Sequence, residues 1–410
     1  MSVITERHIA APHKPIIRIG IQRPRNDYEF AGASDLEGPH FLGDDARDIV
    51  SKFVRPLHPK DGIDYGAILY DEQHAAIMET HMNKGMGQIG SDIALSLPTL
   101  LYFGATDRDL EEQALLSKRT PGSAEYMAYL RTTKSHLEAV TTAWEQPHRK
   151  MVLEHAGFDR LIATDFPIDQ IREKLQHDSK HSETWVREMA IVGKWLGKVF
   201  KLIENREENT DEGAKKAITR ELRTAITDFY RNDIGITWDN QGRTISFHQT
   251  KLGETIAELY VVGDREKAAI VRRLVAQNLL HPAAPGVMFW GDGVNDTLAL
   301  GDKNGADWRI AFDGDAAAKA ANIGVIASDI GKPGIALVKA FKRHPQRRPT
   351  PEQIQTVVYE AQEEVGKGAA IIHVAGPNTP ISLLHEHRAM KIFIRGERGA
   401  AIDHQHEVTT

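Results

Sequence analysis

The sequence predicts an α/β fold: a Rossmann-like core, in which helices flank a parallel sheet, interrupted by mainly helical cap insertions. Short apolar runs alternate with helical segments between residues 256 and 330, which is the rhythm of βαβ units. Several of these runs are apolar without alternation, as strands buried on both faces of a parallel sheet require. Two longer stretches repeat apolar residues at every third or fourth position, the spacing of amphipathic helices.

The composition is typical of a globular protein with more than one structural unit. The chain has 410 residues, of which 41% are hydrophobic and 26% are charged. Its net charge is −6 and it contains no long basic run, which argues against nucleic acid as the main partner. Cysteine is absent, so the sequence excludes disulfides, thiolate metal ligands and cysteine nucleophiles.

The hydropathy pattern predicts a cytoplasmic protein that does not enter a membrane. The N-terminal segment carries charges and a proline where a signal peptide needs an unbroken apolar core. The longest apolar stretch, Ile93–Ala105, contains Pro98 and falls short of the ~20 residues that a spanning helix needs. These features do not predict an oligomeric state.

The first part of the chain is predicted to be a short core segment followed by a helical insertion. Residues 1–26 are interpreted as an N-terminal extension, and residues 27–45 as core, with an apolar strand that ends at acidic residues. Residues 46–155 are predicted to be a helical cap insertion. Within it, residues 123–146 repeat apolar side chains at helical spacing and are predicted to be helix throughout.

The rest of the chain is predicted to contain two more core segments, separated by a second insertion. Residues 156–167 form a buried strand, and residues 168–255 form a second insertion, helical with a hairpin at Asn240-Gln241-Gly242. Residues 256–400 complete the core, and residues 401–410 are a frayed tail. Strands of this last core part are predicted within residues 257–264, 286–293, 307–314, 323–328 and 368–376, and a helix within 265–280.

Polar residues follow several of the predicted strands. Ligands bind beyond the carboxyl ends of the strands in open α/β sheets, where the loops converge. Clustered carboxylates repel one another unless a cation lies among them, and oxygen ligands without cysteine favour Mg²⁺. A cation, a hydroxyl and a lysine around one point would bind a phosphoryl group. The candidate residues are Asp35, Glu37, Thr164, Lys267, Asp292 and Asp296.

These segments resemble the four motifs of the haloacid dehalogenase (HAD) superfamily of phosphatases and phosphotransferases. GDGVND, Gly291–Asp296, matches the fourth motif without departure. AGASDLEGP resembles the first motif, with Asp35 and Glu37 at its two acidic positions. RLIAT resembles the second motif with Thr164, and GDREKAAIVRRL resembles the third with Lys267. The two helical insertions fall where this family places its cap modules.

The resemblance implies a phosphatase reaction. Asp35 would attack phosphorus to form an aspartyl-phosphate, and Glu37 would protonate the leaving alcohol and then accept a proton from water. Thr164 and Lys267 would bind the phosphoryl oxygens, on which charge accumulates in the transition state. The implied substrate is a small phosphorylated metabolite.

The resemblance also implies a Mg²⁺ cofactor. Asp35, Asp292 and the backbone carbonyl of Glu37 would hold the ion, and Asp296 would support it directly, through water or through Lys267. Glu37 is one methylene longer than the family's usual aspartate, and Pro39 replaces its usual threonine or valine. A phosphotransferase or phosphomutase, or a non-catalytic metal-binding or phosphate-binding regulatory protein, is therefore an alternative.

Simpler interpretations of the same residues remain open at this point. GDGVND could be a turn that caps a helix, Thr164 a strand-end hydroxyl, and Lys267 a solvated residue at a helix start. In the C-terminal segment, the histidine pairs are favoured as incidental and the basic residues as a solvated helix face. These C-terminal residues are His385, His387, Arg388, Lys391, Arg395, His404 and His406.

Overall fold

A computed structural model describes most of the chain between residues 30 and 395. The described residues are 30–35, 45–84, 90, 92–116, 119–133, 135–177, 182–238, 244–247, 250–278, 286–301, 305–345 and 347–395. The predicted N-terminal extension and C-terminal tail lie outside them. Among the described helices, none combines the length and the apolar character needed to cross a bilayer.

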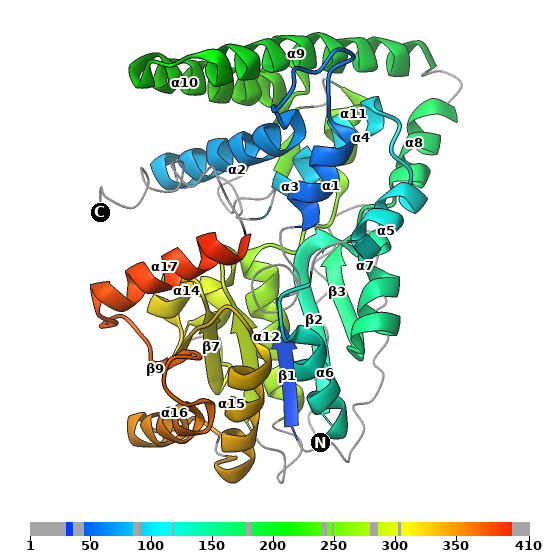
Figure 1. Cartoon of the computed structure of the whole chain (residues 1–410). Helices are drawn as coiled ribbons and strands as arrows, with labels where there is room; N and C mark the ends of the chain where they lie inside the picture. Colours follow the sequence, from blue (N-terminus) through cyan, green and yellow to red (C-terminus); the bar gives the residue numbers. More distant parts are fainter. Residues whose placement is uncertain are drawn as a thin grey trace.

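The core is a seven-stranded sheet in the order β3-β2-β1-β6-β7-β8-β9. Its strands pair in parallel, except that β9 pairs antiparallel with β8. The predicted Rossmann-like α/β fold is confirmed (Figure 1). The strand bounds are β1 Phe30–Ser34, β2 Ser135–Trp144, β3 Arg160–Thr164, β6 Val287–Gly291, β7 Trp308–Phe312, β8 Ile323–Ile326 and β9 Ile371–Val374.

The direction in which strands are added to the sheet reverses next to β1. The chain passes from β1 to β2 and β3 on one side, and then to β6 on the other side of β1. In open α/β sheets, ligands bind beyond the carboxyl ends of the two strands at such a reversal.

Strand β6 shows how the apolar run VMFWG builds both faces of the core. Met288 and Trp290 pack in one hydrophobic cluster, and Val287 and Phe289 in another, because successive side chains of a strand point to opposite faces. Helices α6 (Ser123–Thr132), α15 (Gly331–Arg343) and α16 (Pro351–Val365) contribute to the first cluster. Helices α12 (Asp264–Asn278), α13 (Thr297–Leu300) and α14 (Asp315–Ala320) contribute to the second.

The remaining core helices join or border the sheet. Helix α7 (Glu145–Lys150) continues into a π-helix, Met151–Ala156, and connects β2 to β3. Helix α17 (Ile381–Arg395) packs on α14 and β8 (Figure 1).

The two helical insertions form one cap with a shared hydrophobic core. Leu69 and Leu100 of the first insertion belong to the same buried cluster as Trp195 and Phe229 of the second. Figure 1 shows this helical unit above the sheet, on the side toward which β1 points. Its helices are α1 (Asp45–Phe53), α2 (Tyr65–Lys84), α3 (Asp92–Leu95), α4 (Leu97–Tyr102), α5 (Asp107–Leu116), α8 (Ile168–His177), α9 (Ser182–Glu208), α10 (Glu212–Asp228) and α11 (Lys251–Glu258).

A buried ion cluster also joins the two insertions. Glu72 of α2 is fully buried and accepts hydrogen bonds from Arg206 Nη1 at 2.6 Å and Arg223 Nε at 2.7 Å. The arginines belong to α9 and α10, so this carboxylate is neutralised only when both insertions are folded together. The predicted hairpin is confirmed as β4 (Ile236–Trp238) and β5 (Thr244–Ser246), after a π-helix at Phe229–Asp233.

The helix predicted over residues 123–146 is wrong in its second half. Residues 123–132 form α6, but residues 135–144 form β2, which lies between β1 and β3 inside the sheet. Apolar residues at positions 137, 140 and 144 fit helical spacing, yet the side chains between them are buried as well. An amphipathic helix would expose those positions, whereas a central strand buries both faces. The sheet therefore begins again inside the span 46–155 that was predicted as an insertion.

The strand predicted within residues 257–264 is also wrong. Helix α11 extends to Glu258, and the residues between it and α12 join no sheet. This segment crosses the end of β3 instead: Asp165 N–H donates to the Tyr260 carbonyl, and Val262 N–H donates to Thr164 Oγ1. Val262 is buried, and Leu259, Tyr260 and Val261 are partly buried against the hydrophobic clusters of the cap and the sheet.

Candidate metal centre

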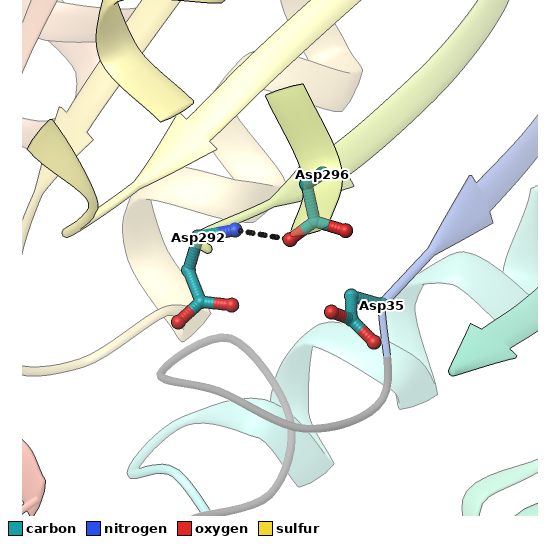
Figure 2. Close-up of side chains that lie close together, drawn as sticks. All are labelled: Asp35, Asp292 and Asp296. Carbon is teal, nitrogen blue, oxygen red and sulfur yellow. Dashed lines mark hydrogen bonds between the residues drawn. The ribbon is translucent and has the colours of Figure 1, made fainter. Parts of the chain in front are cut away.

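Three predicted carboxylates meet at the carboxyl edge of the sheet. Asp35 follows β1, Asp292 follows β6, and Asp296 ends a short 3₁₀ helix, Val294–Asp296. One carboxylate oxygen from each lies within 4.8 Å of the others, and all three side chains are buried. Figure 2 shows the three carboxylates around a common space beside the end of β1.

The GDGVND turn folds around its own last acid. Asp296 Oδ2 accepts hydrogen bonds from the backbone N–H groups of Asp292 and Gly293, both at 3.0 Å (Figure 2). A Cβ on Gly291 would lie only 2.5 Å from Asp296 Cβ, so the close turn requires glycine there. The turn interpretation is thus correct for one oxygen of Asp296, while its Oδ1 faces Lys267.

Lys267 is a buried member of the cluster. Its Nζ donates to Asp35 Oδ2 at 2.5 Å and to Asp296 Oδ1 at 3.0 Å, and the side chain is fully buried. The interpretation of Lys267 as a solvated residue is therefore wrong. It lies in the first turn of α12, whose N-terminus points the lysine toward the ends of β1 and β6.

The electrostatics of the cluster favour an added cation. Burial raises the pKa of Asp35 well above its usual range; the charges of Asp296 and Asp292 raise it further, and Lys267 offsets part of this. Burial alone would lower the pKa of Lys267, but the charges of Asp296 and Asp35 outweigh it and raise the pKa above the ordinary lysine value. The donor set consists of oxygens, which fits a hard divalent cation such as Mg²⁺.

Thr164 has a position different from the one expected. It lies at the end of β3, two strands from β1, and its Oγ1 donates to the Thr142 carbonyl and accepts from Val262 N–H. Both hydrogen bonds are to backbone groups, which favours a structural role. The strand next to β1 is β2, and near its carboxyl end Thr142 accepts a hydrogen bond from Asn295 Nδ2 at 3.2 Å. Thr142 therefore links β2 to the GDGVND turn.

Thr142 was not among the predicted site residues, because β2 was predicted as helix. The run Val140-Thr141-Thr142 is β-branched, which favours a strand, and it ends in two hydroxyls. Asp313, which follows β7 as Asp292 follows β6, was not predicted either. Asp313 is buried with a left-handed φ of 54°, and burial raises its pKa to about 9.

Lys391 of α17 also reaches the cluster. Its Nζ lies 3.4 Å from Asp292 Oδ2 and 3.3 Å from the Asp292 carbonyl oxygen. The interpretation of this residue as part of a solvated helix face is wrong. Nothing in the local sequence indicates this contact, because it depends on how α17 docks on the sheet.

Glu37 and Pro39 lie outside the described residues. The acid–base role of Glu37 and the contribution of its carbonyl to a metal site stay predictions.

The cap touches the core next to this cluster. Gly90, in the connection between α2 and α3, has φ of +102° and is buried against the end of the sheet. A Cβ at this position would lie 2.8 Å from Thr142 Cγ2 and 3.2 Å from Gly263 Cα. The first insertion thus contacts the carboxyl end of β2 at Thr142, the residue that accepts from Asn295.

Comparisons with known proteins establish the fold but not an activity. No family model matches the chain, and no curated protein does. Among solved structures, the chain is similar to that of the gene product AF1437 from Archaeoglobus fulgidus, with a TM-score of 0.62 and 17% sequence identity. The match covers 90% of this chain and 97% of that chain. At this identity the likeness shows a shared fold alone.

Proposed function

We propose that this protein is a Mg²⁺-dependent phosphatase of the haloacid dehalogenase type that hydrolyses a small phosphorylated metabolite in the cytoplasm. The observation that carries the proposal is the buried meeting of Asp35, Asp292, Asp296 and Lys267 where the sheet order reverses. A stable sheet does not require three buried carboxylates and a buried ammonium group at this edge. A phosphoryl-transfer site uses all four groups.

Asp35 is the proposed nucleophile. A carboxylate oxygen of Asp35 forms a bond to phosphorus while the phosphorus–alcohol oxygen bond breaks, and Glu37 gives its proton to the leaving alkoxide. Water then attacks the aspartyl-phosphate, Glu37 takes one proton from it, and Asp35 is released with inorganic phosphate. The hydrogen bond from Lys267 holds Asp35 in place before the reaction.

Lys267 and Thr142 are the proposed ligands of the phosphoryl oxygens. Lys267 Nζ contacts two acids of the cluster, and an incoming phosphoryl group beside Asp35 would share that ammonium. Thr142 replaces Thr164 in this role because β2, not β3, borders β1, and because Thr142 Oγ1 contacts the GDGVND turn through Asn295.

Asp35 and Asp292 are the proposed ligands of Mg²⁺. Asp296 supports them from its turn, because two backbone N–H groups hold its Oδ2 and Lys267 holds its Oδ1. When bound, the ion screens the repulsion between the Asp35 carboxylate and the phosphate dianion. The cap would exclude water and select the substrate, and Gly90 marks where it meets the core.

A screen of phosphorylated metabolites tests this function. Each compound is incubated with the protein, with Mg²⁺ or with EDTA, and released inorganic phosphate is measured, with Asp35→Asn as the matched control. The proposal expects Mg²⁺-dependent release from at least one compound and none from the variant. Transfer of the phosphoryl group to an acceptor without release would identify a phosphotransferase or phosphomutase. Mg²⁺ binding without turnover of any compound would favour a non-catalytic regulatory protein.

A further inference from the structure

Three polar side chains within about one turn of helix α17 contact the core. His387 Nε2 lies 2.8 Å from His373 Nε2 of β9, and the Arg388 guanidinium lies 2.8 Å from Asp315 Oδ2 of α14. One turn later, Lys391 contacts Asp292. Figure 1 shows α17 beside α14, between the sheet and the cap. All three contacts contribute to the docking of α17, and only the third involves a residue of the proposed metal site.

The two lysines at the cluster differ in how firmly they are held. Lys267 is fully buried and donates at 2.5 and 3.0 Å to two acids. Lys391 is 25% exposed, and its contacts with the carboxylate and the carbonyl of Asp292 are longer, at 3.4 and 3.3 Å. A long side chain with a route to solvent and long contacts is the one that a competing cation can displace.

We infer that Lys391 competes with the divalent cation for Asp292, so that metal occupancy and docking of the C-terminal helix are coupled. This inference rests on the proposed metal site. An ammonium group beside a ligand oxygen repels a divalent ion and occupies part of the space that the ion needs. The coupling is reciprocal. If the Lys391–Asp292 contact weakens Mg²⁺ binding by a given factor, bound Mg²⁺ weakens that contact by the same factor.

The coupling gives Lys391 a role distinct from that of Lys267. Removal of Lys267 leaves two buried acids without their ammonium partner, whereas removal of Lys391 leaves a site that binds the ion more tightly. In the absence of the ion, Lys391 keeps the charge of Asp292 neutralised and α17 in place. The competition between Lys391 and Mg²⁺ for Asp292 therefore sets the free Mg²⁺ concentration at which the site is half occupied.

Calorimetric titration with Mg²⁺ tests the inference without an activity assay. The proteins compared at fixed ionic strength are the wild type, Lys391→Met, Lys391→Arg and the control Lys367→Met, which removes an exposed lysine from the turn before β9. Methionine has nearly the helix propensity of lysine, so α17 is retained. Lys391→Met should bind Mg²⁺ about fivefold more tightly than the wild type, and the other two variants should bind as the wild type does.

Each other outcome is decisive. Equal or weaker binding by Lys391→Met overturns the inference while leaving the metal site intact. A raised KM for a phosphate ester with an unchanged Mg²⁺ affinity also overturns it, and assigns Lys391 to the substrate. Absence of Mg²⁺ binding in every protein overturns the proposed metal site itself. Hydrogen exchange gives a second readout: Mg²⁺ should speed exchange in α17 of the wild type and not of Lys391→Met.

Discussion

Lys267 Nζ donates to Asp35 Oδ2 at 2.5 Å although the two residues are 232 positions apart in the sequence. Both side chains are buried. The pair joins the first strand of the core to the helix that precedes β6, across both cap insertions. The ammonium group of Lys267 also holds the proposed nucleophile in one orientation. The same group can then donate hydrogen bonds to the phosphoryl oxygens.

Lys267→Met should destabilise the protein when divalent ions are removed. The change leaves Asp35 and Asp296 buried without their shared ammonium partner, and removal of one partner of a buried ion pair costs about 3–5 kcal/mol. The melting temperature in EDTA measures this. Mg²⁺ should raise the melting temperature of the variant more than that of the wild type, because the ion supplies the missing positive charge. An equal response of both proteins would contradict the proposed position of the ion.

Thr142→Val should lower the activity of the protein, whereas Thr164→Val should lower its stability. Thr142→Val removes the hydroxyl proposed to bind a phosphoryl oxygen and should lower kcat/KM about 10- to 100-fold, and Thr142→Ser should retain most activity. Thr164→Val leaves the Val262 N–H without its acceptor and should cost about 1–3 kcal/mol of stability, with little change in kcat/KM. The reverse pattern would return the phosphate-binding role to Thr164.

Gly90→Ala should impair turnover without weakening Mg²⁺ binding. The new Cβ would lie 2.8 Å from Thr142 Cγ2 at a φ of +102°, so either the cap or the Thr142 side chain must shift. We expect kcat/KM to fall about tenfold or more, with an unchanged Mg²⁺ affinity. Gly62→Ala is the matched control, because Gly62 has φ of +79° and no atom within 4 Å of the new Cβ. Equal loss in both variants would mean that backbone strain alone is responsible.

Asp313→Asn should stabilise the protein more as the pH rises. Burial raises the pKa of Asp313 to about 9 from an ordinary 3.8. Between these values the folded protein keeps a proton that the unfolded chain has released, so stability falls as the pH rises. Asparagine removes this dependence and tolerates a positive φ. In EDTA, the variant should gain at least about 2 °C in melting temperature over the wild type at pH 8, with a smaller gain at pH 5. A pH-independent gain would refute the assignment.

The acidic cluster could be predicted because its determinants are local. A strand that ends in an acid places that acid at the carboxyl edge of a parallel sheet, and the GDGVND turn organises Asp296 through its own backbone. Lys267 follows from its position in the first turn of a helix that packs on the same strands. Each of these relations needs only neighbouring residues and the direction of a strand.

The missed features depend mainly on packing between distant parts of the chain. Apolar residues of β2 fit helical spacing, and the β-branched run Val140-Thr141-Thr142 is the one local sign of a strand, which the burial of β2 on both faces confirms. The contact between Lys391 and Asp292 depends on the docking of α17, to which His387 and Arg388 contribute. The shared core of the two insertions depends on packing between residues that are far apart in the sequence, such as Leu69 and Trp195.

A phosphoryl group bound to Asp35 during turnover is the intermediate that defines the proposed reaction. The protein is mixed with an aryl phosphate, whose phenolate leaves without an acid, and is quenched in acid, digested and analysed by mass spectrometry. The account predicts a phosphoryl group on the peptide that contains Asp35. The label should require Mg²⁺, increase in Glu37→Gln because water attack is slowed, and be absent from Asp35→Asn. Release of phosphate by an enzyme that carries no label on Asp35, or by Asp35→Asn, would contradict the account.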